Sequence, residues 1–307
     1  MKIIFPVFNR VHEARQRLLL EELYKNFQVC ITTYSEKNMN MAEVAVDIAG
    51  KFQKALDSEK PDLALIRGDR YEMLVPAMLC AYNNIPIVHI EGFDLSGVID
   101  NKVRYAISHL SDYHFVTIEE SYGRALSMGF KNVRNYGSLD CEYALKCSQT
   151  LETAPGHEQS YIIVLYHSVP NESSTELFSA LERFSDYTII GIKGNRDYGK
   201  QLYNEEYSPE EFIRLLNGAS CLVGNSSAGI KEASVLGIPV VNIGSRQQNR
   251  LKPSNVVDVP CRSKYIELGI EYQLGVGRYQ PDHTYYKKDT SKKIAETICQ
   301  LVSKSFP

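Results

Sequence analysis

Three acidic residues in the first half of this sequence are placed where they could move protons. Asp69 and Glu91 each come directly after a short apolar run, and Asp100 stands just before a helical pattern. Each also has a structural alternative, because Asp is a favoured helix N-cap and Glu can pair with a nearby Arg. Burial would raise the pKa of Glu91 and suit it to proton transfer near neutrality. Carboxylates on neighbouring loops can act as an acid and a base, so the set predicts acid–base chemistry.

A second group of polar residues follows apolar runs in the other half of the chain. His167 ends the run that starts at Tyr161, and it could donate to a phosphate or act as an acid, although a lone histidine there is often structural. The stretch GNSSAGIKE at 224–232 places Ser226 and Ser227 between an apolar run and a helical pattern. Small residues there leave backbone N–H groups for a phosphate. Glu232 could accept both hydroxyls of a ribose.

Two further polar turns lie in the second half of the sequence. Arg246 and Arg250 follow the next apolar run and could clamp a diphosphate, and the turn around Asn195 is of the type that reads a base edge. The sequence contains no metal-ligand spacing, Walker loop, nucleophile elbow or dinucleotide fingerprint.

The elements that position these residues are short β-branched runs alternating with longer amphipathic ones, which indicates parallel sheets with crossover helices. Ligands of such sheets bind at the carboxyl ends of the strands. Periodicity lapses around 151–160, which we interpret as a linker. The expected fold is α/β, with two Rossmann-like domains, residues 1–152 and 153–307, facing a cleft. The second domain is expected to end in a helix over Asp289–Ser305, and one helix is expected over His12–Lys25.

Composition limits the function classes. The formal net charge of −3 gives no global positive field to recruit nucleic acid or an anionic membrane. No apolar stretch approaches the ~18 residues of a membrane helix, and the N-terminus does not read as a signal peptide. The seven cysteines are scattered and mostly within apolar runs, as expected for buried thiols in a reducing compartment. We expect a cytoplasmic protein.

Three stretches resemble the hydrolysing UDP-N-acetylglucosamine 2-epimerases, which have the two-Rossmann fold of GT-B glycosyltransferases. They are GDRYEMLVPAM, HIEGFDLSGVIDNKVRYAISHLSDYHFV and GNSSAGIKEASVLGIPVVNIGSRQQNR. The resemblance implies elimination of UDP to an acetamidoglucal, followed by hydration to a free C2-epimeric sugar, with no metal or redox cofactor. It also implies a nucleotide sugar as the small-molecule partner, and relatives of this fold often form homodimers.

Carried over onto this sequence, the resemblance implies two sets of site residues. The acid–base and sugar-binding set is Asp69, Glu91, Asp100 and His167. The UDP-binding set is Arg10, Arg70, Asn195, Ser226, Ser227, Glu232 and Arg246.

The sequence also departs from the family pattern. The histidine-bearing loop after the second strand is missing, Phe93 replaces a glycine and Ser168 replaces a proline. Two enzyme classes therefore stay open. The first is epimerase-like chemistry, favoured because the four acid–base candidates persist. The second is a UDP-sugar-dependent GT-B glycosyltransferase, in which Phe93 would help shape an acceptor site for a glycan or a modified nucleic-acid base. A weaker third hypothesis is a catalytically inactive nucleotide-sugar sensor.

Overall fold

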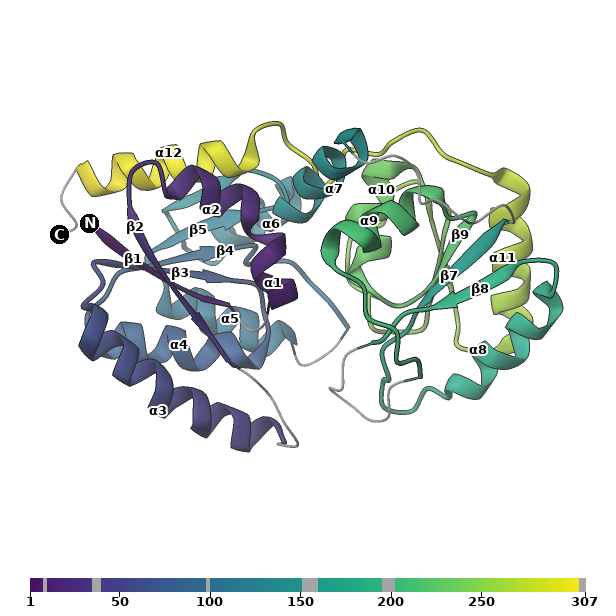
Figure 1. Cartoon of the computed structure of the whole chain (residues 1–307), viewed down its shortest axis with the longest axis horizontal. Helices are drawn as coiled ribbons and strands as arrows, with labels where there is room; N and C mark the ends of the chain where they lie inside the picture. Colours follow the sequence, from purple (N-terminus) through teal and green to yellow (C-terminus); the bar gives the residue numbers. More distant parts are fainter. Residues whose placement is uncertain (8–9, 35–39, 98–99, 151–159, 195–201, 304–307) are drawn as a thin grey trace. The chain divides into compact units, whose positions relative to one another are not determined.

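The computed structural model describes the chain except for residues 8–9, 35–39, 98–99, 151–159, 195–201 and 304–307, and of residues 10–12 it describes the backbone alone. The chain divides into two compact units. Unit 1 comprises 1–94, 99–142 and 286–307, and unit 2 comprises 95–98 and 143–285. Each unit contains its own parallel sheet with helices (Figure 1).

The sheet of unit 1 has six parallel strands in the order β2-β1-β3-β4-β5-β6. The strands are β1 (Lys2–Val7), β2 (Gln28–Thr33), β3 (Leu63–Arg67), β4 (Ile87–Ile90), β5 (Tyr113–Val116) and β6 (Val133–Asn135). The helices of unit 1 are α1 (Arg10–Arg15), α2 (Arg17–Leu23), α3 (Met41–Glu59), α4 (Tyr71–Tyr82), α5 (Asp100–Leu110), α6 (Glu119–Ser127) and α12 (Thr290–Ser303), and the boundary between the units falls within α7 (Leu139–Thr150).

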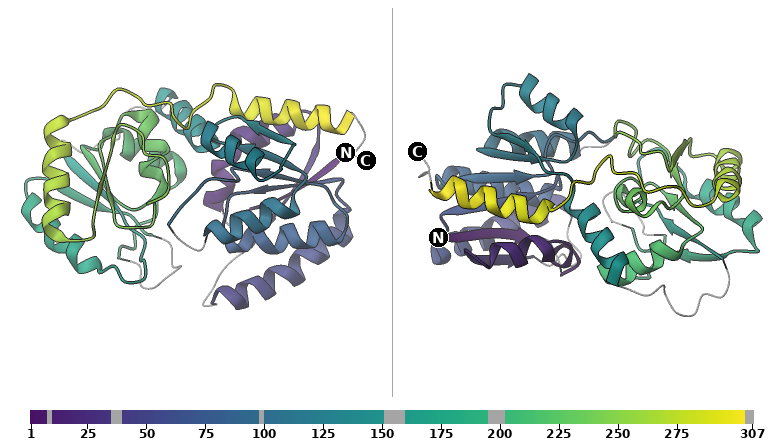
Figure 2. Two further views of the ribbon diagram at one scale, coloured as in Figure 1. Left: turned by 180° about the vertical axis from the view of Figure 1, so that it is seen from behind. Right: turned by 90° about the horizontal axis from the view of Figure 1, so that it is seen from above.

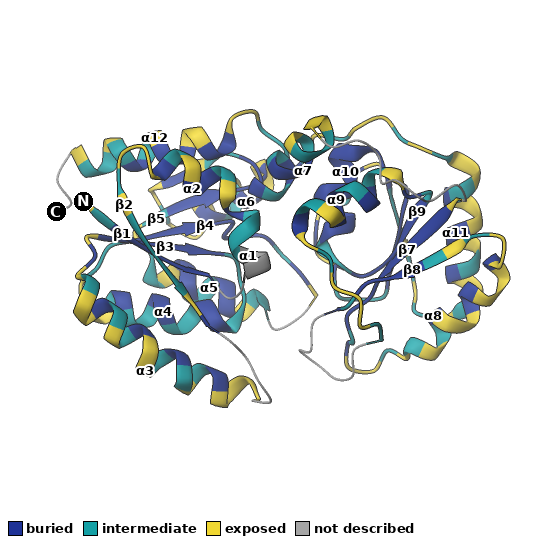
Figure 3. Ribbon diagram, viewed as in Figure 1, coloured by how far each residue is buried: buried dark blue, intermediate teal, exposed yellow. Residues whose placement is uncertain are grey.

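Alternating side chains of these strands fill two cores, one on each face of the sheet. Ile3 and Phe5 of β1 pack on one face with residues of α2 and α12, whereas Ile4 packs on the other with residues of α3, α4 and α5. Figures 1 and 2 show these two groups of helices on opposite sides of the sheet. Figure 3 shows that burial is concentrated in the strands, while the helices expose their outer faces.

The predicted single helix over His12–Lys25 is wrong, because the chain breaks at Gln16 into α1 and α2. The Gln16 side chain is fully buried and its Oε1 accepts a hydrogen bond from Arg67 Nη1 at 2.8 Å. A polar side chain that enters the interior needs such a partner, and the residue at the break is the one that provides it to Arg67.

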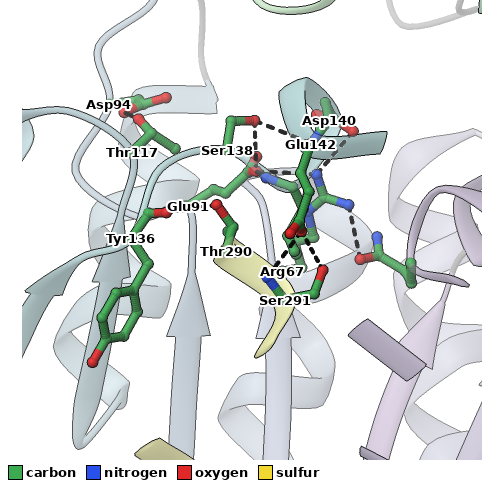
Figure 4. A network of polar contacts seen from close by, with 12 residues as sticks. Arg67, Glu91, Asp94, Thr117, Tyr136, Ser138, Asp140, Glu142, Thr290 and Ser291 are labelled. Atoms are coloured by element: carbon green, nitrogen blue, oxygen red, sulfur yellow. Dashed lines mark hydrogen bonds and ion pairs between the residues drawn. The ribbon is translucent and has the colours of Figure 1, made fainter. Parts of the chain in front are cut away.

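Helix α12 packs on unit 1, whereas the sequence division at residue 152 assigned it to the second domain. Ile294 and Ile298 lie in the same core as Leu19 and Leu23 of α2, so the helix covers an apolar face that α2 alone leaves open. The start of α12 is also fixed by hydrogen bonds, since Thr290 Oγ1 donates to the Tyr136 carbonyl at 2.7 Å and Ser291 N to the Glu142 carboxylate at 2.9 Å (Figure 4).

The sheet of unit 2 has five parallel strands in the order β11-β10-β9-β7-β8. These strands are β7 (Tyr161–Leu165), β8 (Thr188–Gly191), β9 (Cys221–Gly224), β10 (Val240–Ile243) and β11 (Val256–Val259). Helices α8 (Ser174–Leu181) and α11 (Ser263–Val276) pack on one face, together with the short helix η1 (Glu182–Phe184) that continues α8. Figure 1 shows α9 (Pro209–Gly218) and α10 (Glu232–Leu236) on the other face. The short helix η2 (Ser227–Gly229) precedes α10. Helix α9 begins with a capping box formed by Ser208 and Glu211.

Two further expectations concern membranes and thiols. None of the helices in the described parts of the chain is both long and apolar enough to cross a bilayer. All seven cysteines are free thiols; Cys80, Cys141 and Cys221 are buried, and the other four are only half-buried.

Candidate functional site

In unit 1, Glu91 belongs to a buried ionic network at the carboxyl edge of the sheet (Figure 4). Its Oε1 accepts from Arg67 Nη2 at 3.0 Å, from Ser138 Oγ at 3.0 Å and from Leu139 N at 3.1 Å. The same Arg67 nitrogen is 2.9 Å from Asp140 Oδ1. Arg67 and Glu91 are both more than nine-tenths buried, so the ion pair has little competition from water.

This network changes the expected role of burial at Glu91. Burial alone favours the neutral carboxyl, but an adjacent guanidinium and two further donors favour the carboxylate. Burial lowers the pKa of Arg67, the carboxylates of Asp140 and Glu91 raise it, and the net direction is upward. The alternative that Glu91 pairs with an Arg is confirmed, and a catalytic role remains a prediction.

The loop after β4 has an unusual backbone. Glu91 and Phe93 both have left-handed φ values, 63° and 62°, which cost a non-glycine residue roughly 1–2 kcal/mol each. Gly92 between them lies so close to His89 that a Cβ would be 2.8 Å from its Nδ1. Packing must compensate for this strain, and backbone held in this way clusters at functional sites.

The Phe93 side chain supplies part of that packing. It is fully buried, and its ring lies edge-on to those of Phe130 and His114, with centroids 4.9 Å and 5.2 Å apart. The proposed contribution of Phe93 to an acceptor site is therefore wrong, because its ring points into an aromatic cluster inside unit 1.

His89 positions the loop that carries Asp69. Its Nε2 lies 2.8 Å from the Gly68 carbonyl, which can only accept, so Nε2 carries the proton and Nδ1 accepts from Ser108 Oγ at 2.9 Å. Burial lowers the pKa of His89 to about 4, so the ring is neutral at physiological pH.

Asp69 pairs with Arg104 of α5, whose side chain is fully buried. The Arg104 guanidinium also donates to the Asp94 carbonyl, and to Asn101 Oδ1 at 2.7 Å. Asp100 is the first residue of α5 and lies one turn before Arg104, on the same helix face. The crossover from β4 brings the start of α5 to the sheet edge where Asp69 and Glu91 lie. The three predicted acids thus share that edge.

Arg70, predicted to bind UDP, is held by a carboxylate of its own unit. Its guanidinium donates to both oxygens of the buried Glu72 at 2.7–3.1 Å. The side chain remains about one-third exposed.

In unit 2, Asn225 links the ends of β7 and β9. Its side chain accepts from His167 N at 2.8 Å and donates to the His167 carbonyl at 2.9 Å, and it is fully buried. The Asn225 carbonyl accepts from Arg246 Nη1 and Gln247 Nε2, both at 3.0 Å. His167 and Arg246 are therefore brought to one place by the asparagine of the GNSS motif.

The remaining GNSS residues form a tight turn. Gly224 has φ 150°, and a Cβ on it would lie 2.1 Å from the Leu165 carbonyl oxygen, so only glycine fits. Ser226 caps η2 by accepting from Ala228 N at 3.3 Å, and Ser226 and Ser227 are half-buried. Glu232 is buried at the start of α10. The predicted single helix after Ser227 is thus broken into η2 and α10.

The loop after β10 is fixed by Glu172. One Glu172 oxygen accepts from both Ser245 N and Ser245 Oγ at 2.7 Å, and Gly244 adopts φ 72° against the same carboxylate. This contact sets the path of the backbone that carries Arg246.

Two predicted residues lie outside the described part, namely Asn195 and the side chain of Arg10. Among the described residues, no group of three or more His, Cys, Asp or Glu side chains is placed to hold a metal ion. The polar residues that sequence reasoning missed are Gln16, Arg67, Asp94, Arg104, Ser138, Asp140, Glu172 and Asn225. Arg67 could have been found from the sequence, because it is a charged residue at the end of the apolar strand Leu63–Arg67.

Comparison with known proteins agrees with this arrangement. The sequence model of the UDP-N-acetylglucosamine 2-epimerase family matches residues 12–299. The chain is 32% identical over 274 residues to the UDP-N-acetylglucosamine 2-epimerase of Neisseria meningitidis serogroup B, covering 79% of this chain and 72% of that protein. It is also 32% identical over 284 residues to the UDP-N,N'-diacetylbacillosamine 2-epimerase (hydrolyzing) of Legionella pneumophila, covering 83% and 74%.

The solved structure of the Methanocaldococcus jannaschii UDP-GlcNAc 2-epimerase, in complex with UDP-GlcNAc and UDP, has the same fold. Its TM-score is 0.85 at 17% identity, covering 98% of this chain and 100% of that chain. The predicted GT-B-like pair of Rossmann-like units is thereby confirmed. The family model spans nearly all of the sequence, so this chain belongs to the UDP-N-acetylglucosamine 2-epimerase family.

Proposed function

We propose that this protein is a hydrolysing UDP-HexNAc 2-epimerase. In the proposed reaction the C2–H and C1–O bonds of the sugar break, and UDP leaves with the C1–O electron pair to give a glycal. Water then adds across the double bond, with hydroxyl at C1 and a proton at C2, to give the free C2-epimeric sugar.

The observation that carries this proposal is the gathering of Asp69, Glu91 and Asp100 at one sheet edge of unit 1 in a chain of the 2-epimerase family. The C2–H bond is weakly acidic, so its removal needs a carboxylate in a desolvated site. Glu91 is buried and paired with Arg67, which favours the ionised form that a base requires.

The residues of unit 2 supply the proposed nucleotide site. Arg246, Ser226 and Ser227 would bind the diphosphate, and Glu232 would accept the ribose hydroxyls. Asn225 ties the Arg246 guanidinium to the turn that carries both serines. His167, fixed through its backbone by the same asparagine, would assist departure of the diphosphate.

The hydrolysing branch is favoured by the GNSS form of the motif at 224–227 and by the Legionella relative, whose name carries that activity. The Neisseria relative, which is equally similar, is named a UDP-N-acetylglucosamine 2-epimerase. The transferase alternative loses one of its supports, because Phe93 is buried.

Product analysis in D₂O tests the proposal. UDP-GlcNAc and UDP-N,N'-diacetylbacillosamine are each incubated with the protein without an acceptor, and the products are examined by mass spectrometry and NMR. We expect UDP and a free sugar that carries deuterium at C2 with inverted configuration. A deuterated UDP-sugar with no free sugar would indicate a non-hydrolysing epimerase. UDP release only after an acceptor is added would indicate a transferase.

A further inference from the structure

The carboxylate of Glu172 joins two strand ends of unit 2. One of its oxygens accepts from Ser245 N and from Ser245 Oγ, both at 2.7 Å, in the loop after β10. The other oxygen accepts from the hydroxyl of Tyr166, the residue that follows β7, at 3.2 Å. Ser245 immediately precedes Arg246, the proposed ligand of the diphosphate. The path of the chain into Arg246 is therefore set by a side chain that is remote in sequence.

The backbone around Glu172 gives its side chain a fixed starting point. Glu172 N donates to the Val169 carbonyl at 3.3 Å and so closes a turn. Within this turn Asn171 has a left-handed φ of 65°, which asparagine tolerates better than most residues. Ser173 follows as the N-cap of α8, and its side chain accepts from Thr175 N. Glu172 thus lies between a closed turn and a capped helix.

The loop after β10 fits closely around the carboxylate. Gly244 adopts a left-handed φ of 72°, and a Cβ on it would lie 2.2 Å from the nearer Glu172 oxygen. A side chain at position 244 would therefore push the carboxylate away from Ser245. Both donors of Ser245, its N–H and its hydroxyl, already serve Glu172. A phosphate at this loop must therefore depend on Arg246 and not on these two donors.

Tyr166 anchors the second oxygen of the carboxylate. The tyrosine is buried, and burial, together with the neighbouring Cys261 and Glu172, raises the pKa of its hydroxyl. The phenol therefore stays protonated at physiological pH and can donate its hydrogen bond. With one oxygen held by Tyr166, the other is kept facing Ser245.

Arg246 is thus held at both ends of its residue. Its guanidinium donates to the Asn225 carbonyl at 3.0 Å, and the peptide that leads into it is fixed by Glu172. An arginine that is already ordered loses less conformational entropy when it binds an anion, so its contribution to affinity is larger. The Glu172 carboxylate is itself negative and would repel a diphosphate, so direct contact with the ligand is not its role.

We infer that Glu172 is a positioning residue of the nucleotide site, which raises the affinity for UDP by acting through Ser245 on Arg246. The inference rests on the proposed function, because it assumes that Arg246 binds the diphosphate of UDP. It assigns to Glu172 an effect on the binding of UDP and little effect on turnover at saturating substrate.

Three variants of Glu172 separate its geometry from its charge. Glu172→Gln keeps the length of the side chain and an oxygen that can accept both Ser245 bonds, but it loses the charge. Glu172→Asp keeps the charge but is one methylene too short to reach. Glu172→Ala removes both properties. The matched control is Glu176→Ala, because Glu176 is also half-buried and accepts from a backbone N–H, that of Ser263 at 2.6 Å at the start of α11.

UDP affinity is measured by calorimetry, stability by the urea midpoint and turnover with a UDP-HexNAc. In Glu172→Ala and Glu172→Asp we expect UDP to bind about fivefold to tenfold more weakly, the usual effect of losing one or two hydrogen bonds. In Glu172→Gln and Glu176→Ala the affinity should stay within about twofold of the wild type. Both alanine variants should lower the urea midpoint, so lost stability alone cannot produce this pattern.

A double variant tests whether Glu172 acts through Arg246. If it does, adding Glu172→Ala to Arg246→Ala should weaken UDP binding no further, because the arginine to be positioned is already gone. A further loss equal to that of Glu172→Ala alone would overturn the inference.

Three other results would also overturn it. One is wild-type affinity in both Glu172→Ala and Glu172→Asp. Another is a loss in Glu172→Gln that Glu172→Asp does not share, which would assign the effect to charge. The third is an equal loss in Glu176→Ala, which would indicate general loosening of unit 2. If Glu172→Ala does not fold, the aspartate and glutamine variants decide.

Failure of the proposed function gives different results. A wild-type protein that binds UDP but produces no free sugar would refute the hydrolysing reaction, while the affinities would still decide the role of Glu172. A wild-type protein that does not bind UDP would refute both.

Discussion

Replacement of Arg67 by methionine tests whether the buried network at Glu91 is an interacting unit. Arg67→Met keeps much of the side-chain volume but leaves two carboxylates, those of Glu91 and Asp140, without their cation. Their side chains are only 8% and 13% exposed, so water cannot replace the lost partner. Breaking a buried ion pair from one side costs about 3–5 kcal/mol, and we expect a loss of that size in the free energy of unfolding.

The matched control is Arg17→Met. Arg17 also forms an ion pair, with Glu21 at 2.9 Å, but the two side chains are 64% and 48% exposed. Such a pair contributes less than about 1 kcal/mol, so the control should barely change stability. The comparison separates the effect of burial from the effect of losing one positive charge.

Urea denaturation followed by circular dichroism gives the free energies, and a double-mutant cycle gives the coupling. Combining Arg67→Met with Glu91→Gln removes one of the two stranded charges and should recover roughly 1–3 kcal/mol. The reasoning is refuted if Arg67→Met costs no more than Arg17→Met. It is also refuted if the double variant loses the full sum of the two single losses.

Three further predictions concern binding, turnover and pH. Arg246→Ala should weaken UDP binding by about 1–3 kcal/mol, measured by calorimetry, and an undiminished affinity would place the diphosphate elsewhere. Asp100→Asn and Glu91→Gln should each lower turnover at least ~10²-fold with UDP affinity nearly unchanged. If a variant keeps wild-type turnover, the carboxylate that it lacks serves only as a helix cap or an ion-pair partner. The pKa of His89 is about 4 in the folded protein, against 6.5 for a free histidine. The unfolded chain therefore binds a proton at this residue more readily than the folded protein does. The contribution of His89 to the free energy of unfolding is complete above pH 6.5 and is lost as the pH falls toward 4. His89→Gln should flatten the fall in urea midpoint over that range, and an unchanged slope would assign the acid sensitivity to other groups.

The parts of the fold that follow from local pattern were predictable. The strand ends at Asp69 and Glu91, the GNSS turn and the capping box at Ser208 all depend on residues within a few positions of one another. Helix α11 was missed because Tyr265 and other large apolar residues lie on its exposed face, and no apolar stripe stands out. Strand β11 was missed because it is only four residues long.

The parts that depend on distant contacts could not be read from the sequence. Arg67 meets Gln16 across 51 positions and Glu91 across 24, and no spacing rule connects such residues. The direction of the Phe93 side chain could not be predicted either. Its backbone is left-handed, and the side chain therefore points toward Phe130 and not where an extended strand would place it. Both features arise from tertiary packing, which local propensity does not encode.

The location of α12 has a consequence for the order in which the protein folds during synthesis. Ile294 and Ile298 complete a core whose other members, such as Leu19 and Leu23, leave the ribosome early. Residues 143–285, which make up all of unit 2 except 95–98, are made in between. Unit 2 can therefore fold while unit 1 still exposes an apolar face. Unit 1 is the first to be synthesised and the last to complete its core. During that interval the uncovered apolar face is the part of the nascent chain most prone to aggregation.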